Sequence, residues 1–438
     1  MARLTRTFGT PTNDKIFTLS VWIKRSNLGA SHTILCGGSS SRPTPQLVLD
    51  GNYKFAFSSY NGSGYDVELR SNALLRDPNG WYHVVMAVDT TQATSSNRVK
   101  AYINGEQITS WSTESYPSQN FVLEMNKAHT HAVGANTFGG IAGNMGQCIL
   151  SHYHFIDGIA YTPSAFGETD ATTGEWKIKT SPSVTYGNNG FFIFKDGNSV
   201  TDQSGNGNNW TVAGSNTITK TEDCPSNVFA TMNPLDNYYP SATFSNGNNT
   251  VVTNSTAICP ITGTLAMTSG KYYWEVKPTA TSGSDSWYTI GITGRQTTEL
   301  NQELGNYAYQ YGYMGEDGTV RNNSSNIATL STYTAGDIIG IALDLDNNLI
   351  YFYKNGAVQN SGTGLAVSPA ASTDFGAYLP AVADWSSQAT FTFQANFGNG
   401  YFGTTAVSSA GTNASNNGIF EYDVPTGYTA LSTKGLNE

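Results

Sequence analysis

The sequence predicts an all-β protein built from two antiparallel β-sandwiches in tandem, joined by an ordered connector. The main observation is a segment in which Ile339, Ile341 and Leu343 alternate with small or polar residues, the period of a strand with one buried face. An Asx-rich turn follows, and a second strand returns to Asn355-Gly356, a pair that favours tight hairpin turns. A shorter strand ending in Asn104-Gly105 repeats the pattern and predicts a second unit of related design.

Composition supports the all-β prediction and limits the classes of function. Charged residues make up only 12% of the chain, while Gly contributes 46 residues, a profile typical of short strands, tight turns and uncharged polar surfaces. A formal net charge of -10 disfavours nucleic-acid binding, because phosphate recognition needs a basic stripe. No apolar run approaches membrane-spanning length, and the first residues show no signal-peptide apolar core, so we expect no membrane insertion.

In the first half of the chain, strands are expected where apolar residues alternate or run together between turn residues. The run from Trp81 to Asp89 is apolar on both faces, as expected for a central strand that is covered on each side. The expected strands are residues 17–23, 47–49, 53–57, 81–89, 99–104, 149–156 and 191–194.

Five motifs of this half occur in a fixed order. They are Phe17-Thr-Leu-Ser-Val-Trp22, Trp81-Tyr-His-Val84, Ala101-Tyr-Ile-Asn-Gly105, Phe155-Ile-Asp-Gly158 and Asp202-Gln-Ser-Gly-Asn-Gly207. Together they resemble the laminin-G-like, concanavalin-A-like jelly rolls that are common in phage virion proteins. The resemblance assigns residues 1–215 to this domain and implies two antiparallel sheets with rim loops that bind glycans or a structural Ca²⁺.

Residues 216–252 form the expected connector. The segment is rich in Asn, Thr and Ser, and Cys224-Pro225 marks a turn. We interpret it as ordered because Val228 and Phe229 offer apolar surface that a flexible linker lacks. Residues 223–227 and 231–236 also resemble the joint between these two domain types in marine phage proteins.

The second domain, residues 253–438, also carries its motifs in order. They are Gly270-Lys-Tyr-Tyr-Trp-Glu-Val276, Trp287-Tyr-Thr-Ile-Gly-Ile-Thr293, Tyr311-Gly-Tyr-Met-Gly-Glu-Asp-Gly318, the hairpin 336–358 and Tyr378-Leu-Pro-Ala-Val-Ala383. In this order they resemble a SPRY domain, again a two-sheet sandwich. SPRY domains are protein-interaction modules whose partner is chosen by rim loops, so the resemblance implies binding and leaves the ligand open.

A glycosidase is the first enzymatic alternative, because laminarinase-type enzymes share the sandwich of the first domain. They need carboxylates two residues apart on one strand face. The nearest groupings, Glu168-Thr-Asp170 and Glu316-Asp317, lack a third carboxylate in register and lie in turn-like contexts. The sequence also has no nucleophile elbow and no phosphate loop, so we expect no enzyme and no required cofactor.

All six histidines fall in the first domain, and four of them form the alternating pairs His129-x-His131 and His152-x-His154. On strands, both rings of a pair would project from one face, where they could hold Zn²⁺, Ni²⁺ or iron. The alternative, which we favour, is that they are outward-facing polar positions opposite Tyr153 and Phe155.

A Gly-rich loop places oxygen atoms of Asp202, Ser204, Asn206 and Asn208 close together, a composition suited to Ca²⁺. The same loop needs no metal to form, because its glycines already supply the turn geometry. The sequence leaves both interpretations open.

Aromatic residues of the second domain form the candidate ligand-binding surface. Four tyrosines from Tyr307 to Tyr313 would line one side of an extended chain, and exposed Tyr stacks on sugars and makes protein interfaces at low entropy cost. A Tyr ladder buried against a neighbouring layer would give the same pattern. The candidate ligand-binding residues are Trp287, Tyr288, Tyr307, Tyr309, Tyr311, Tyr313 and Trp385.

We therefore predict a non-enzymatic phage virion protein, a tail or head fibre that adheres to host-surface glycan or protein. It would be assembled in the host cytoplasm and located in the virion, with other virion proteins and copies of itself as partners. A trimer fits a fibre, but no coiled coil specifies one. The alternatives are a capsid decoration or tail architectural protein with no host ligand and, more remotely, a polysaccharide depolymerase.

Overall fold

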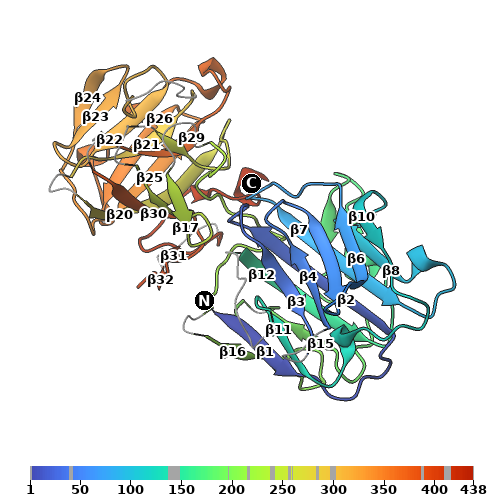
Figure 1. Cartoon of the computed structure of the whole chain (residues 1–438). Helices are drawn as coiled ribbons and strands as arrows, with labels where there is room; N and C mark the ends of the chain where they lie inside the picture. The colour runs from blue at the N-terminus through green and yellow to red at the C-terminus, as the bar shows by residue number, and fades with distance from the viewer. Residues whose placement is uncertain are drawn as a thin grey trace. The chain divides into compact units, whose positions relative to one another are not determined.

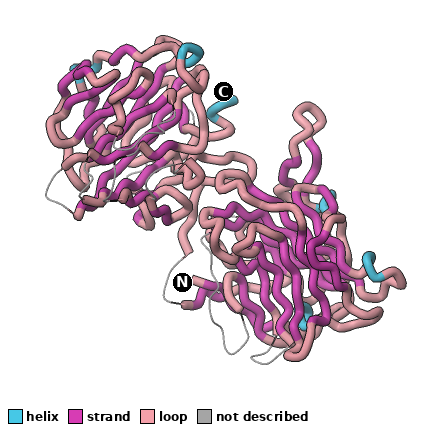
Figure 2. The backbone as a smooth tube through the Cα atoms, turned by 45° about the horizontal axis from the view of Figure 1, so that its top comes forward, coloured by secondary structure: helices cyan, strands magenta, loops and turns pink. Residues whose placement is uncertain are grey.

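The computed structural model describes residues 2–38, 43–136, 148–195, 197–214, 218–236, 242–254, 258, 260–282, 286–295, 302–385, 389–408 and 416–437. The chain divides into two compact units, Met1–Lys220 and Thr221–Glu438. Regular structure in the described residues consists of strands and a few short 3₁₀ turns, which confirms the all-β prediction (Figures 1 and 2). In this part of the chain no helix is long and apolar enough to cross a membrane.

The first unit is a sandwich of two antiparallel sheets. The eight-stranded sheet has the order β10 (Trp111–Ser115), β6 (Tyr65–Ser71), β5 (Phe55–Tyr60), β4 (Thr44–Leu49), β3 (His32–Cys36), β11 (Thr130–Val133), β1 (Arg3–Thr7) and β16 (Thr211–Ala213). The six-stranded sheet has the order β15 (Phe191–Ile193), β12 (Cys148–Asp157), β2 (Ile16–Arg25), β7 (Trp81–Asp89), β8 (Val99–Ile103) and β9 (Glu106–Gln107). A separate hairpin joins β13 (Gly167–Thr169) to β14 (Trp176–Ile178).

The core of this unit lies between its sheets, where alternate side chains of each strand meet. Phe17, Leu19 and Val21 of β2 are fully buried on this inner side. The outer face of the six-stranded sheet is also covered, because Trp176 of the β13–β14 hairpin donates its indole N–H to Nδ1 of the buried His83 at 2.9 Å. Cover on both sides explains why β7 is apolar on both faces.

The second unit is likewise a sandwich. One sheet has the order β17 (Thr243–Ser245), β18 (Thr250–Val252), β30 (Phe391–Asn396), β20 (Lys271–Thr281), β25 (Ile339–Asp344), β26 (Leu349–Lys354) and β27 (Ala357–Val358), with β28 (Leu365–Ala366) on β26 and β33 (Thr429–Ala430) on β20. The other has the order β19 (Ile261–Thr262), β29 (Leu379–Asp384), β21 (Tyr288–Thr293), β22 (Gln310–Met314), β23 (Thr319–Asn322) and β24 (Ser325–Thr329). A short ladder joins β31 (Tyr401–Phe402) to β32 (Thr405–Ala406).

The predicted hairpin of the second unit is confirmed as β25 and β26. Ile339, Ile341 and Leu343 are fully buried between the sheets. The following turn uses Asn355 with a φ of 48° and Gly356 with a φ of 79°, the left-handed conformations that the Asn-Gly pair tolerates.

The predicted connector does not form a separate segment in the structure. Phe229 bridges to Ser432, Met232 bridges to Gly263, and β18 pairs with β30. Phe229 and Met232 are each only 1% exposed. The described residues from Thr221 onward therefore complete the sheets of the second unit, which begins well before residue 253.

Candidate functional site

The outer face of the six-stranded sheet in the second unit carries a row of small residues. Gly312 of β22 is paired with Arg321 of β23 and with Gly291 of β21, and Gly291 is paired with Ala381 of β29. Residues that are directly opposite in antiparallel strands share a face. The side chain of Arg321 therefore has room to lie across the sheet.

Glycine at position 312 is required by a close backbone approach. A Cβ atom there would collide with the carbonyl oxygen of Leu304, whose side chain packs on Ala381 and Ala383. The small residues thus let the segment around Leu304 seal this face of the sheet, while Arg321 and Trp385 form its more exposed border.

Arg321 lies over the ring of Trp385. Its guanidinium carbon is 3.9 Å from the ring centroid, within the range of a cation–π contact. Its Nε donates to Oδ1 of Asn326, the paired residue on β24, at 3.1 Å. The rings of Trp385 and Trp287 have centroids 6.3 Å apart and planes inclined at 57°. We call Arg321, Trp287 and Trp385 the Trp-Arg platform.

The platform presents hydrogen-bond donors that its own unit does not use. Neither Nη atom of Arg321 and neither indole N–H of Trp287 and Trp385 has a partner among the residues that the structure describes. All three side chains are partly buried. Donors held in fixed positions at the border with solvent are suited to a ligand that supplies acceptors.

The charge balance of the second unit makes Arg321 unusual. The unit holds 6 of the 22 Lys and Arg residues but 17 of the 32 Asp and Glu residues. Three of its basic residues form ion pairs, Lys271 with Asp344 at 2.9 Å, Arg295 with Asp374 at 3.7 Å and Lys354 with Asp337 at 3.4 Å. Within the described residues Arg321 forms none, although carboxylates outnumber bases in this unit.

A second cation–aromatic contact lies just beyond the end of β21. The guanidinium carbon of Arg295 is 4.2 Å from the ring centroid of Tyr307. Tyr309, in the same loop, has a φ of 66°, a conformation that is rare for a bulky residue. This pair differs from the platform because Asp374 already neutralises Arg295.

The predicted extended Tyr ladder is not formed. The chain turns before Gln310, so only Tyr311 and Tyr313 share a strand face, and that face is the core. Tyr288 is also a core residue, with its ring against Phe391 and Phe393. Of the seven predicted ligand-binding residues, Trp287, Trp385, Tyr307 and Tyr309 keep partly exposed side chains.

Arg321 is not among the binding residues predicted from the sequence. The feature of the sequence that could have indicated Arg321 is that it is one of few basic residues in an acid-rich half. It also follows Val320, a strand residue whose side chain points into the core. Proximity to Trp385 depends on how β23 and β29 are arranged in the sheet, which no local pattern states.

Asp384, the residue before Trp385, is also absent from the residues predicted from the sequence. Its side chain faces the core beside Tyr288 and is only 1% exposed. Burial raises the pKa of Asp384 to about 7, and an interaction with the Thr253 side chain offsets part of this rise. Neither carboxylate oxygen has a hydrogen bond of normal geometry from the described residues, so its charged form is costly in this position.

The loop predicted to suit Ca²⁺ is held by hydrogen bonds of the protein. Oδ1 of Asp202 accepts the N–H groups of Phe192 and Ser204 at 2.8 and 2.9 Å, and Oδ2 accepts the Ser204 hydroxyl at 2.7 Å and the Asn208 N–H at 2.8 Å. Asn206 donates to the carbonyl oxygen of Gly190 at 3.0 Å. Because each carboxylate oxygen already accepts two bonds, these bonds explain the loop geometry, and the donor set does not fit a cation as arranged.

The first predicted histidine pair is bound by backbone atoms. Both ring nitrogens of the fully buried His131 lie 2.9 Å from carbonyl oxygens, those of His129 and Met125. Nε2 of His129 accepts the N–H of Gly38 at 2.8 Å. Burial lowers the pKa of His131 to about 3.

The second pair does not alternate as expected, because His152 has a φ of 44° at a bulge in β12. Its Nδ1 lies 2.8 Å from Oγ of Ser151, and Nδ1 of His154 lies 2.9 Å from the hydroxyl of Tyr186. Within the described residues, no group of three or more His, Cys, Asp or Glu side chains is placed to hold a metal ion. The expectation of outward-facing polar positions does not hold for His131 and His154, which are at most 2% exposed.

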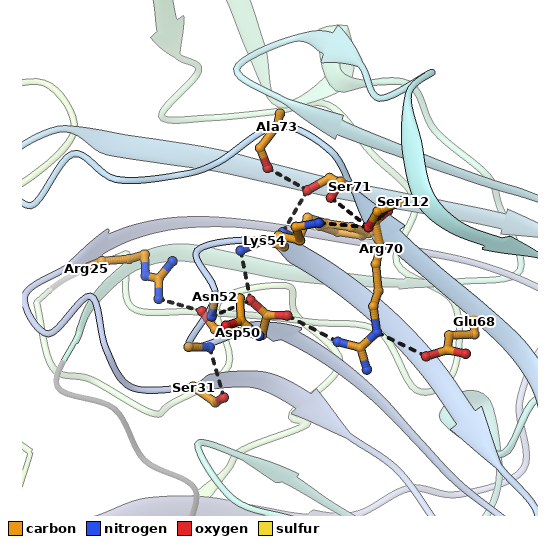
Figure 3. A network of polar contacts seen from close by, with 12 residues as sticks. Arg25, Ser31, Asp50, Asn52, Lys54, Glu68, Arg70, Ser71, Ala73 and Ser112 are labelled. Atoms are coloured by element: carbon orange, nitrogen blue, oxygen red, sulfur yellow. Dashed lines mark hydrogen bonds and ion pairs between the residues drawn. The ribbon is translucent and has the colours of Figure 1, made fainter.

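A polar network around Asp50 in the first unit shows a buried carboxylate whose two oxygen atoms are both used by the protein (Figure 3). Oδ1 of Asp50 accepts the N–H groups of Asn52 and Lys54 at 2.9 Å, and Oδ2 pairs with Arg70 at 3.1 Å. The fully buried Arg25 donates to the backbone oxygen of Asp50 at 2.9 Å. This network joins neighbouring loops and offers few unused donors, in contrast to the Trp-Arg platform.

Comparison with known proteins identifies both units. Residues 5–140 match the Concanavalin A-like lectin/glucanases superfamily, and residues 271–396 match the SPRY domain. A solved SPRY domain of human HERC1 is 20% identical with a TM-score of 0.31, covering 37% of this chain and 96% of that one.

Curated relatives match within a short segment. The Ran-binding proteins 9/10 homolog of Drosophila melanogaster is 36% identical over 88 residues, which are 20% of this chain and 9% of the relative. Ran-binding protein 9 of Homo sapiens is 35% identical over 88 residues, which are 20% of this chain and 12% of the relative. The chain therefore spans only a small part of the length of these relatives.

These relatives overturn the predicted function and location. They are Ran-binding proteins of animals, not virion proteins. The prediction of a phage fibre that adheres to host cells is therefore wrong, together with its capsid, tail and depolymerase alternatives and its placement in the virion. The domain assignments are independent of that origin: the chain carries a concanavalin A-like unit followed by a SPRY unit.

Proposed function

We propose that this chain is a non-enzymatic protein-binding protein, in which the Trp-Arg platform of the SPRY unit binds an exposed segment of a partner protein. The observation that carries the proposal is the position of Arg321, stacked on Trp385 with both Nη groups unpaired among the described residues. Trp and Arg dominate the energetics of protein interfaces, because they combine large contact area with directional donors.

The rigidity of the platform supports this proposal. Arg321 lies within β23, Trp287 directly precedes β21, and Trp385 directly follows β29. Side chains positioned by paired strands lose little entropy on binding, which favours affinity. The hydrogen bond from Arg321 to Asn326 further fixes the guanidinium plane.

A catalytic role is not part of the proposal. Glu168 and Asp170, the nearest acidic grouping of the first unit, lie at the β13–β14 hairpin and form ion pairs with Lys177 at 3.7 and 3.1 Å. Carboxylates tied to a surface lysine are poorly suited to act as a nucleophile and an acid. We also propose no required cofactor.

The experiment is a selection from a displayed library of short random peptides, using the immobilised full-length chain. We expect the wild-type chain to enrich peptides that the Trp287→Ala/Trp385→Ala variant does not bind. The control is Tyr65→Ala, which removes a 48% exposed aromatic residue of the first unit and should leave binding unchanged. Retention of both thermal unfolding transitions checks that each variant is folded. Equal binding by wild type and the double variant would refute the proposed site.

Ran is one defined partner to try, because the relatives that match the SPRY unit are named as Ran-binding proteins. The test is binding of purified Ran to the full-length chain, with Arg321→Gln as the surface variant. Binding that the variant weakens would identify a protein ligand of the platform. Binding that ignores the variant would place Ran elsewhere on the chain.

A further inference from the structure

We infer that the Trp-Arg platform recognises one side-chain carboxylate, from an Asp or Glu within the bound segment. This inference rests on the proposed function and adds the chemical class of its ligand. It depends on three features of the platform: its unused donors, its charge and its planar rings.

The donors of the platform match a carboxylate in number and position. With Nε of Arg321 bonded to Asn326 at 3.1 Å, the edge formed by its two Nη atoms is left for a ligand. A carboxylate can accept two parallel hydrogen bonds from such an edge, and bidentate pairs of this kind are stronger than bonds to a neutral carbonyl. The indole N–H groups of Trp287 and Trp385, which have no partner among the described residues, supply further donors.

The charge of the platform favours an anion over a neutral acceptor. Arg321 has no acidic partner among the described residues, whereas three other bases of the same unit are paired. The nearby Asp384 does not neutralise it, since that carboxylate shares the core face with Tyr288. A carboxylate of the ligand would therefore supply the negative charge that pairs with Arg321, which the described residues of the unit do not supply.

The acid-rich surroundings limit the ligand to a single acidic residue. The unit holds 17 Asp and Glu residues against 6 Lys and Arg, so a run of acidic residues in the partner would be repelled as it approached. One Asp or Glu flanked by neutral or basic residues avoids this repulsion. The ring of Trp287 beside Trp385 offers a surface for an apolar flanking residue.

The test starts from the peptides that the full-length wild-type chain enriches. The library peptides are joined to their nucleic acid through their C-termini, so any carboxylate they present comes from a side chain. We expect Asp or Glu to recur at one position of the enriched peptides. Replacing it by Asn or Gln should weaken binding at least about tenfold, the effect of losing a charge-assisted hydrogen bond.

Variants of the chain assign that carboxylate to Arg321. Arg321→Gln should weaken binding of the acidic peptide to the same extent, and the two losses should not add when variant and neutral peptide are combined, because both changes remove one contact. Arg321→Lys keeps the charge without the planar fork and should give an intermediate affinity. The control is Lys277→Gln. Lys277 lies in β20, on the other sheet of the unit, with its ammonium group 5.8 Å from the ring centroid of Phe402.

The outcomes separate this inference from the proposed function. Enriched peptides that depend on the two tryptophans but contain no recurring acidic residue would overturn the carboxylate inference and leave the binding site intact. If no peptide depends on Trp287 and Trp385, both proposals fail.

Discussion

The Asn-Gly turns of the two units are built in the same way. Asn104 has a φ of 49°, its N–H donates to the carbonyl oxygen of His83 at 2.9 Å, and its Oδ1 accepts the N–H of His83 at 2.7 Å. Asn355 has a φ of 48° and makes the same two bonds with Ile338, each at 2.8 Å. A shared sequence motif thus gives one local structure in two different sandwiches.

Both units bury carboxylates, such as Asp157 of the first unit at 1% exposure, but the buried imidazole and carboxyl groups whose pKa is shifted differ between the units. The first unit buries neutral imidazoles: Nδ1 of His83 accepts from Trp176, Nε2 lies 2.8 Å from Oγ of Ser20, and burial lowers its pKa to about 3. In the second unit these groups are carboxyl groups. Burial raises the pKa of Asp384 and of Glu275 to about 7. The shared Asn-Gly turn therefore does not predict which buried side chains of a unit change their protonation state with pH.

The two carboxylates of the second unit also differ from each other. Glu275 accepts the N–H groups of Glu421 at 2.9 Å and Tyr422 at 3.0 Å, and the side-chain amide of Asn396 at 3.2 Å. Asp384 has no such bonds from the described residues. Glu275 thus holds the backbone at 421–422 against the sheet, whereas the carboxylate of Asp384 has no hydrogen bond of normal geometry from the described residues.

The largest expected effect tests whether the two cores are independent. Phe155→Ala and Phe393→Ala each truncate a phenylalanine that is at most 1% exposed, one in each unit. Each should lower the free energy of unfolding of its own unit by about 3–5 kcal/mol. Calorimetry of the full-length chain should show two transitions, with only one shifted by each variant. A shift of both transitions by either variant would contradict independent cores.

Acidification from pH 7 to pH 5 should shift the two transitions in opposite directions. The folded first unit keeps His83 neutral with a pKa of about 3, while the unfolded chain takes up a proton near pH 6.5, so stability is lost as pH falls below 6.5. The folded second unit binds protons at Asp384 and Glu275 near pH 7, above their ordinary values of 3.8 and 4.5, so its stability rises as pH falls. Each group contributes about 2 kcal/mol over this interval.

Calorimetry across this pH range checks the signs. The midpoint of the first unit should fall and that of the second should rise by several degrees. The Phe→Ala variants assign each transition to its unit. Parallel movement of both midpoints would refute the proposed difference in buried groups.

A smaller effect is expected from Asp384→Asn. The amide cannot ionise, and the described residues form no normal hydrogen bond with the carboxylate that the change would break. The stabilisation of the second unit by the variant should therefore be about 2–3 kcal/mol larger at pH 8 than at pH 5, because the wild-type unfolded chain, with a pKa of 3.8, is ionised at both pH values, whereas the folded acid is ionised only above about pH 7. The control is the exposed Asp374→Asn. A variant that is destabilised at pH 8 would show that the buried charge has a partner.

The smallest effect is expected from the shared turns. Asn104→Ala and Asn355→Ala each put alanine in the left-handed region, which asparagine tolerates better because its side chain bonds locally to the backbone. Each variant also removes one hydrogen bond from the side chain. Each should cost its own unit about 1–2 kcal/mol, measured as the shift of the corresponding transition. Unequal losses of stability would show that the two turns, although alike in geometry, contribute differently to the free energy of unfolding of their units.

Much of the fold could be predicted because its signals are local. Alternation at residues 17–23 and 339–343 specified strands, and the Asn-Gly pairs specified turns, since these patterns act over a few residues. The place where the second unit begins could not be predicted, because Phe229 and Met232 bridge to Ser432 and Gly263, which are distant in the sequence. The prediction of an extended Tyr ladder was wrong because the chain turns before Gln310. The alternating tyrosines therefore lie partly in a loop and partly in β22.

The sequence by itself determined the strand pattern and the tight turns, because each depends on neighbouring residues, and its ordered motifs indicated two sandwich domains through their resemblance to known families. Only the tertiary structure decided that Tyr311 and Tyr313 face the core, that Asp384 is buried without a normal hydrogen bond from the described residues, and that Arg321 reaches Trp385. These features depend on strand order and register, which bring together residues more than sixty positions apart. A binding surface of this kind is therefore a property of the assembled sheet rather than of any one motif.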